Sequence, residues 1–181
     1  EYAQKRSSKL CCVDKANVLE TSRLWRETVQ SMEKEFPDIE VSYEFVDAVA
    51  MRLVQWPNSY DVLITSNLFG DILTDEASVI SGSMGLMPSA SVGSENALYE
   101  PIHGSYPEAA GKNIANPIAS ILSLSMMLDH SFNLKKESEI INNAVEDSLK
   151  NKYVTTDLSS DINSFSTDQV GDYIVDFIEK N

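Results

Sequence analysis

The pattern of apolar and polar residues in the first 80 positions predicts three strand–helix pairs. Short apolar runs of strand length are each followed by a longer segment whose apolar residues recur every three or four positions, as on one face of a helix. We expect strands at 10–13, 41–46 and 62–65, and helices at 18–35, 47–56 and 68–80. This alternation is typical of an α/β fold with a largely parallel sheet.

The pattern changes after residue 81, where a glycine-rich stretch predicts loops and two short strands, at 89–93 and 97–100. Three helices are expected after these strands. The first starts at Asn116-Pro117 and runs to about 128, the second covers 138–150, and the third covers 167–180 with Thr167 as its cap. The first of these helices has apolar or small side chains on nearly all of its sides, which predicts that it is fully buried.

Residues 67–76, Asn-Leu-Phe-Gly-Asp-Ile-Leu-Thr-Asp-Glu, are the most informative part of the chain. Asp71 and Asp75 are four residues apart, so their carboxylates lie one turn apart on one side of the expected helix and repel each other. A divalent cation would relieve the repulsion, and oxygen ligands favour Mg²⁺ or Mn²⁺ over zinc. An isolated Asp-x-x-x-Asp is more often a solvated acidic surface. Because apolar residues lie among these acids, we expect the helix to be largely buried, with Asn67 as its N-cap.

Two further charged residues stand where the first two strands are expected to end. Lys15 follows the first strand, and ligands of α/β proteins bind at the carboxyl ends of strands. A lysine there could act as an acid or base, although a surface lysine that closes a strand is the simpler interpretation of Lys15 alone. Asp47 begins the helix after the second strand, where an N-cap and a ligand role fit equally well.

The loop from His103 to Pro117 is the second region with candidate chemistry. Gly104 and Gly111 would let the backbone approach a ligand closely. Small polar residues before a helix can hold phosphate through backbone N–H groups. The segment lacks a Gly-x-Gly-x-x-Gly pattern, so the common dinucleotide signal is absent. The loop alone predicts an anion or nucleotide contact, and His103 fits a packed histidine equally well.

Composition narrows the classes of function. Lys and Arg number 14 and Asp and Glu 28, which gives a formal charge of −14. No basic stripe is visible, which argues against a nucleic-acid surface, and no segment approaches the ~20 apolar residues of a membrane span. The two cysteines, Cys11 and Cys12, lie in a strand-like run without ligands at zinc spacing. They predict buried free thiols in a reducing cytoplasm, with chloroplast or mitochondrial matrix as alternatives.

Together these segments resemble the β-decarboxylating hydroxyacid dehydrogenases, the family of isocitrate and 3-isopropylmalate dehydrogenases. Residues 67–75 are similar to the metal-site segment of the family. Residues 13–26, 88–93 and 99–105 are similar to its isopropylmalate branch in particular. The likeness covers the whole chain and implies the C-terminal portion of this α/β fold. Residues 1–81 would belong to the substrate, metal and dimerisation domain, and 82–181 to the NAD-binding domain.

The resemblance also implies roles for single residues. Lys15 would handle the proton of the substrate hydroxyl and enol in a partner subunit's site. Asp71 and Asp75 would hold Mg²⁺ or Mn²⁺ with Asp47 of the other subunit, so that Lys15 and Asp47 are the expected substrate contacts. The expected NAD contacts are Asn17 and Glu100 near the nicotinamide, His103, Gly104, Ser105, Tyr106, Pro107, Glu108 and Ala109 around the adenosine and phosphates, and Asn116 at the adenine with Asp157 nearby. Glu108 replaces an Asp of many relatives, and an acid there still favours NAD over NADP.

The implied activity is NAD-dependent oxidative decarboxylation of 3-isopropylmalate, a step of leucine biosynthesis, in a cytoplasmic homodimer. The alternatives are a sibling enzyme acting on tartrate, homoisocitrate or isocitrate, and a non-catalytic dimerising chain of the same fold. The sequence starts without Met, and residues 1–6 resemble the end of a helix. In the family, arginines that bind the substrate carboxylates and a tyrosine beside the lysine come from an N-terminal half. We therefore expect a piece of a longer chain that is inactive alone.

Overall fold

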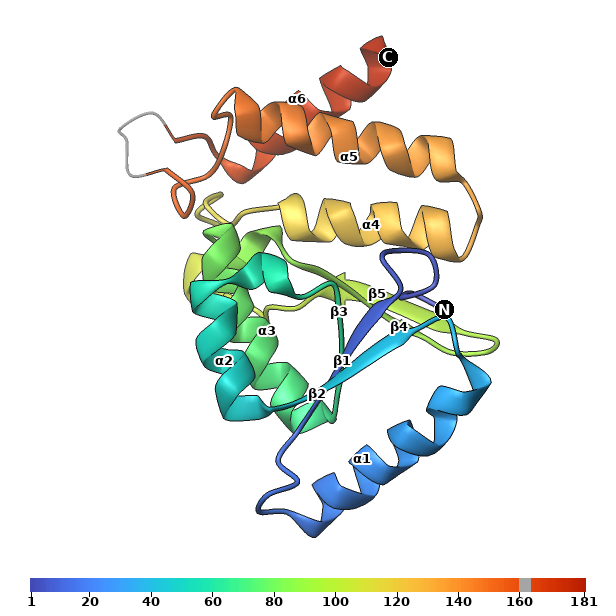
Figure 1. Ribbon diagram of the computed structural model, residues 1–181. Helices are drawn as coiled ribbons and strands as arrows, with labels where there is room; N and C mark the ends of the chain where they lie inside the picture. The colour runs from blue at the N-terminus through green and yellow to red at the C-terminus, as the bar shows by residue number, and fades with distance from the viewer. Residues whose placement is uncertain (160–163) are drawn as a thin grey trace. The chain divides into compact units, whose positions relative to one another are not determined.

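The computed structural model describes residues 1–159 and 164–181, which divide into two compact units, residues 1–80 and 81–181 (Figure 1). Each unit has its own sheet and its own hydrophobic core. None of the helices in these described ranges has the length and apolar content needed to cross a bilayer.

A three-stranded parallel sheet forms the centre of the first unit. Its strands β1 (Lys9–Asp14), β2 (Glu40–Phe45) and β3 (Val62–Thr65) lie in the order β2-β1-β3. They alternate with α1 (Glu20–Met32), which a short 3-10 turn (Glu33–Glu35) extends, with α2 (Val46–Gln55), and with α3 (Asn67–Ser81). The predicted α/β alternation is confirmed.

The core of the first unit gathers around β1. Its buried members are Cys11, Val13, Val49, Leu53 and Leu73. Cys11 and Cys12 are both free and buried, as the sequence predicts. Burial raises the pKa of the Cys12 thiol to about 11.

The prediction that α3 is largely buried is wrong for the single chain. Leu68, Ile72 and Val79 are 66%, 56% and 77% exposed, and only Leu73 and Ser78 of this helix are buried. The helix also includes Asn67 as its first residue, where we expected a cap. Leu68, Ile72 and Val79 therefore form an exposed apolar stripe on this helix.

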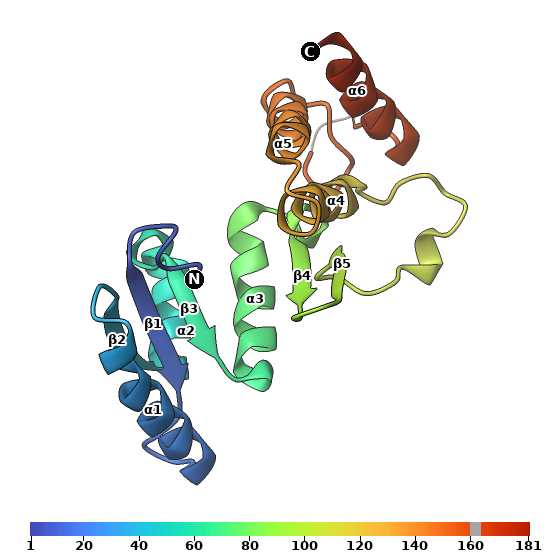
Figure 2. The same ribbon diagram turned by 90° about the vertical axis from the view of Figure 1, so that its right-hand side faces the viewer.

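The second unit combines two strands with three helices. β4 (Pro88–Val92) and β5 (Ala97–Pro101) pair in antiparallel fashion. α4 (Ile118–His130) packs on both strands and on α5 (Lys135–Lys150), which in turn contacts α6 (Thr167–Lys180). Figure 2 shows α4 next to the strands, with α5 and α6 beyond it.

Two details of these helices correct the predictions. The cap of α6 is Ser166 and not Thr167, because the Ser166 hydroxyl accepts the Gln169 N–H while the Gln169 side chain accepts the Ser166 N–H. α4 begins at Ile118, which is fully buried, but Leu124 of the same helix is 44% exposed, so the predicted full burial is wrong.

Candidate functional site

Lys15 and Asp47 meet at one end of the first sheet. Lys15 follows β1, and Asp47 lies in the first turn of α2, directly after β2. The parallel pairing of β1 with β2 brings these two chain segments to the same edge. Lys15 Nζ donates a hydrogen bond to Asp47 Oδ1 and lies 5.7 Å from the centroid of the Phe45 ring. The hydrogen bond from Lys15 lowers the pKa of the Asp47 carboxyl.

The turn that carries Lys15 is fixed by side chains that the sequence analysis misses. Asp14 Oδ1 accepts the Ala16 N–H at 2.8 Å, and Arg26 of α1 donates to both oxygens of Asp14, at 2.7 and 2.9 Å. Arg23, one turn earlier on α1, donates to the Ala16 carbonyl at 2.9 Å. A buried acid at a strand end, followed by arginines on the next helix, is the sequence signal that could have indicated this arrangement.

Asp71 and Asp75 are exposed residues of α3. Two carboxylates one helical turn apart match part of the oxygen ligand set that a hard divalent ion takes. Within residues 1–159 and 164–181, no group of three or more His, Cys, Asp or Glu residues could hold a metal ion. In this described part of the chain Asp71 and Asp75 thus have no third ligand of these types beside them, so a metal site there would need further donors.

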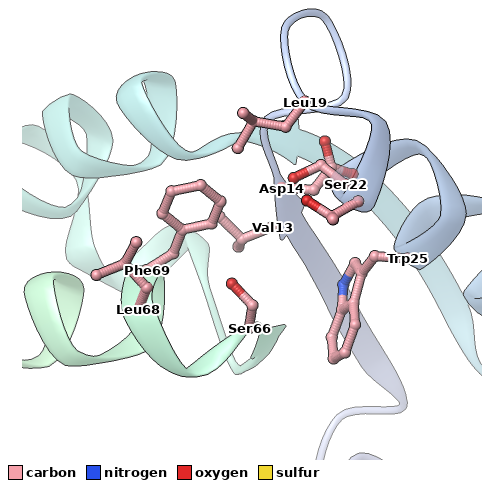
Figure 3. A pocket seen from close by; sticks show the side chains of 9 residues that line it. Val13, Asp14, Leu19, Ser22, Trp25, Ser66, Leu68 and Phe69 are labelled. Carbon is pink, nitrogen blue, oxygen red and sulfur yellow. The ribbon is translucent and has the colours of Figure 1, made fainter.

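A cleft of about 250 Å³ lies beside β1 and the start of α1 (Figure 3). Leu68 and Phe69 project into it from one side and Trp25 from the other. Asp14 is the only charged residue among its described lining residues, and its carboxylate already accepts hydrogen bonds from Arg26 and Ala16. The cleft therefore offers no free charge to an anionic substrate.

In the second unit, the loop after β5 exposes most of the predicted cofactor residues. Ser105, Tyr106 and Glu108 are exposed, while Ala109 is buried in a 3-10 turn. A Cβ built on Gly104 would meet nothing within 4 Å, so packing does not explain this glycine, and the close approach of a ligand stays a reason for it.

Three other predicted residues lie near the ends of strands or turns. His103 Nδ1 lies 3.0 Å from the Gly104 carbonyl oxygen. Glu100 is an exposed residue of β5, and Asn17 is an exposed residue of the turn after β1, in the first unit. Their contacts with NAD stay predictions.

Asn116 and Asp157 are joined directly. Asn116 Nδ2 donates to Asp157 Oδ2 at 3.0 Å, and Asn116 Oδ1 accepts the Ile118 N–H at 3.0 Å at the start of α4. The hydroxyls of Ser83 and Thr155 also donate to Asp157. Burial alone would raise the pKa of Asp157, but these three hydrogen bonds outweigh it and lower the pKa. Both polar groups of the Asn116 side chain thus take part in hydrogen bonds within the unit.

Comparison with known proteins identifies the family. The profile of the isocitrate/isopropylmalate dehydrogenase family matches residues 1–174, and the chain belongs to this family. The 3-isopropylmalate dehydrogenase of Buchnera aphidicola subsp. Diuraphis noxia is 52% identical over 100% of this chain and 50% of that protein. The 3-isopropylmalate dehydrogenase of Aquifex aeolicus is 50% identical over 99% of this chain and 50% of that protein. The chain spans about half the length of the curated relatives it matches.

Solved structures confirm the predicted fold. The chain matches isocitrate dehydrogenase from Methylococcus capsulatus with a TM-score of 0.93 and 40% identity, over 98% of this chain and 52% of that one. It matches a β-decarboxylating dehydrogenase from Thermococcus kodakarensis with a TM-score of 0.86 and 38% identity, over 99% of this chain and 52% of that one.

Proposed function

We propose that this chain is part of an NAD-dependent 3-isopropylmalate dehydrogenase, which acts in leucine biosynthesis. The observation that carries the proposal is the Lys15–Asp47 pair at the carboxyl ends of two parallel strands. The names of the relatives that are 50–52% identical support the choice of substrate.

Lys15 would carry the proton in this reaction. Its ammonium is held between Asp47 and the Phe45 ring, a position from which it can exchange a proton with a hydroxyl or enol oxygen. The uncharged Lys15 amine would take the proton of the substrate hydroxyl, and NAD, when bound, would supply the acceptor for the hydride of the same carbon. The β-carboxylate of the resulting ketone would leave as carbon dioxide, and the Lys15 ammonium would return its proton to the enolate that remains.

Asp71 and Asp75 of one chain, with Asp47 of a second copy, would hold Mg²⁺ or Mn²⁺. When bound, the ion would act as a Lewis acid on the substrate's hydroxyl and carboxylate oxygens. The support is the exposed carboxylate pair and the exposed apolar stripe on the same side of α3, which a second copy would cover. The assembly would therefore be a homodimer with shared sites.

NAD would bind to the second unit, along residues 103–109 with Asn116 and Asp157. Residues 82–181 would form the C-terminal part of the NAD-binding domain, and residues 1–81 part of the substrate and dimerisation domain. The exposed Glu108 carboxylate would accept a ribose diol and repel the 2′-phosphate of NADP. The buried free cysteines fit a reducing compartment, for which we propose the cytoplasm.

The test is NADH formation from 3-isopropylmalate in the presence of Mg²⁺. A chain extended at its N-terminus by the half that its relatives carry should be active, and Lys15→Met should remove most of its rate. The 181-residue chain alone should be inactive, because catalysis needs all groups in one geometry. Turnover of isocitrate, tartrate or homoisocitrate but not of 3-isopropylmalate would contradict the substrate. No turnover of any of these by the extended chain would favour a non-catalytic role.

A further inference from the structure

We propose that Arg26 and Asp14 are positioning residues for Lys15. Their two-point ion pair, in which the Asp14 carboxylate is buried, fixes the turn after β1. Through that turn it sets the direction in which the lysine leaves the sheet. The inference rests on the proposed role of Lys15 in proton transfer.

Asp14 fixes the backbone on both sides of the lysine. It is the last residue of β1, its carboxylate is 1% exposed, and it accepts the N–H of Ala16 at 2.8 Å. Because Asp14 and Ala16 flank Lys15, one carboxylate determines the path of the chain before and after it. The Arg23 hydrogen bond to the Ala16 carbonyl at 2.9 Å ties the same turn to α1 a second time.

Arg26 is itself held in one orientation. Its Nε and Nη2 donate to the two oxygens of Asp14 at 2.7 and 2.9 Å. Its guanidinium carbon lies 5.5 Å from the ring centroid of Tyr43 and 5.1 Å from that of Phe45. The Phe45 ring also lies 5.7 Å from the Lys15 ammonium, so one ring contacts both cations.

This geometry favours positioning over substrate binding. The Nε–H and Nη2–H groups of Arg26 both donate to a buried carboxylate, so the charge of this guanidinium is already paired and is not available to a substrate carboxylate.

The chain also provides a matched comparison for Arg26. Arg6 forms an ion pair with Asp61 just before β1 and β3, at the end of the sheet opposite to Lys15.

The experiment compares Arg26→Lys with Arg6→Gln in the N-terminally extended enzyme. A lysine keeps the charge at position 26 but cannot make the planar two-point contact. We expect Arg26→Lys to lower kcat by about 10- to 100-fold, while the KM for 3-isopropylmalate changes by less than about threefold. Arg6→Gln should lower thermal stability and leave kcat at the wild-type value.

A double variant separates the position of Lys15 from the stability of the fold. Arg26→Gln alone would leave the Asp14 carboxylate buried without a cation, which strongly destabilises a protein. The Asp14→Asn/Arg26→Gln variant removes that charge, so its melting temperature should recover relative to Arg26→Gln while its kcat stays low. The inference would be overturned if both the melting temperature and kcat recovered in the double variant, or if Arg26→Lys had a wild-type kcat. High activity in Lys15→Met would instead refute the proposed function.

Discussion

Asp14 and Asp61 both pair with an arginine at opposite ends of one sheet, but their surroundings differ. The Asp14 side chain is 1% exposed, with Arg26 on both of its oxygens. The Asp61 side chain is 17% exposed and accepts hydrogen bonds from Arg6 and from the hydroxyl and N–H of Ser7. The hydrogen bonds from the Ser7 hydroxyl, from Arg6 and from the Ser7 N–H, in that order, lower the pKa of Asp61 to about 2.

Asp61 should therefore make the stability of the fold depend on pH in the acid range. Its pKa in the folded chain, about 2, is below the unfolded value of about 4. Its contribution is thus complete above about pH 4 and is lost as the pH falls towards 2. We expect the wild-type chain to lose more free energy of unfolding between about pH 5 and pH 3 than Asp61→Asn does. Urea unfolding at both pH values measures the difference. As a control, Asp38→Asn, at an exposed position, should lose as much free energy of unfolding as the wild type does. The prediction would be contradicted if Asp61→Asn also lost as much as the wild type.

At the scale of elements, two glycines border the proposed cofactor site for different reasons. Gly85 lies in the 3-10 turn Met84–Leu86, and a Cβ there would lie 2.7 Å from the Cβ of Asn116, at the start of α4. A Cβ on Gly104 would meet nothing within 4 Å. The first glycine allows two elements to pack, whereas the second leaves the surface of a loop open.

Alanine should affect stability at Gly85 and cofactor binding at Gly104. Gly85→Ala should lower the free energy of unfolding by about 1–3 kcal/mol, because Asn116 must shift. Gly104→Ala should change it by less than about 0.5 kcal/mol, yet it should raise the KM for NAD in the extended enzyme if residues 103–109 bind the cofactor. Denaturant unfolding and steady-state kinetics measure the two effects. An unchanged free energy of unfolding in Gly85→Ala would count against the packing role of this glycine. An unchanged KM for NAD in Gly104→Ala would count against cofactor binding by residues 103–109.

Local patterns predicted the order and type of the main elements, because each strand or helix repeats its own apolar spacing. They missed the Ser166 cap, although Ser166-Thr167-Asp168-Gln169 is itself a local capping-box pattern, and they failed where a distant contact decides. The hydrogen bond from Ser83 to Asp157 joins residues 74 positions apart, so no local pattern contains it.

At the scale of the whole molecule, the single chain leaves an apolar surface uncovered. Periodicity showed that one face of α3 is apolar, but it could not show what covers that face. Leu68, Ile72 and Val79 recur on one side of the helix, and Asp75 lies among them. Val54 of α2 is also 64% exposed. Exposed apolar surface of this kind marks an interaction site, and in the proposed homodimer the second copy would cover it and supply the missing metal ligand.

A charge on this stripe should therefore break both the assembly and the activity. Val79→Lys would bury an unpaired ammonium in the proposed interface, which is strongly destabilising, so the extended enzyme should sediment as a monomer at micromolar concentration. The matched control is Val175→Lys on α6, where the wild-type side chain is 52% exposed and a lysine should leave the dimer intact. If the metal site is shared, the Val79→Lys monomer should lose its Mg²⁺-dependent turnover although Asp71 and Asp75 are unchanged. A wild-type enzyme that is monomeric, or a monomeric variant with full activity, would contradict a site built from two copies.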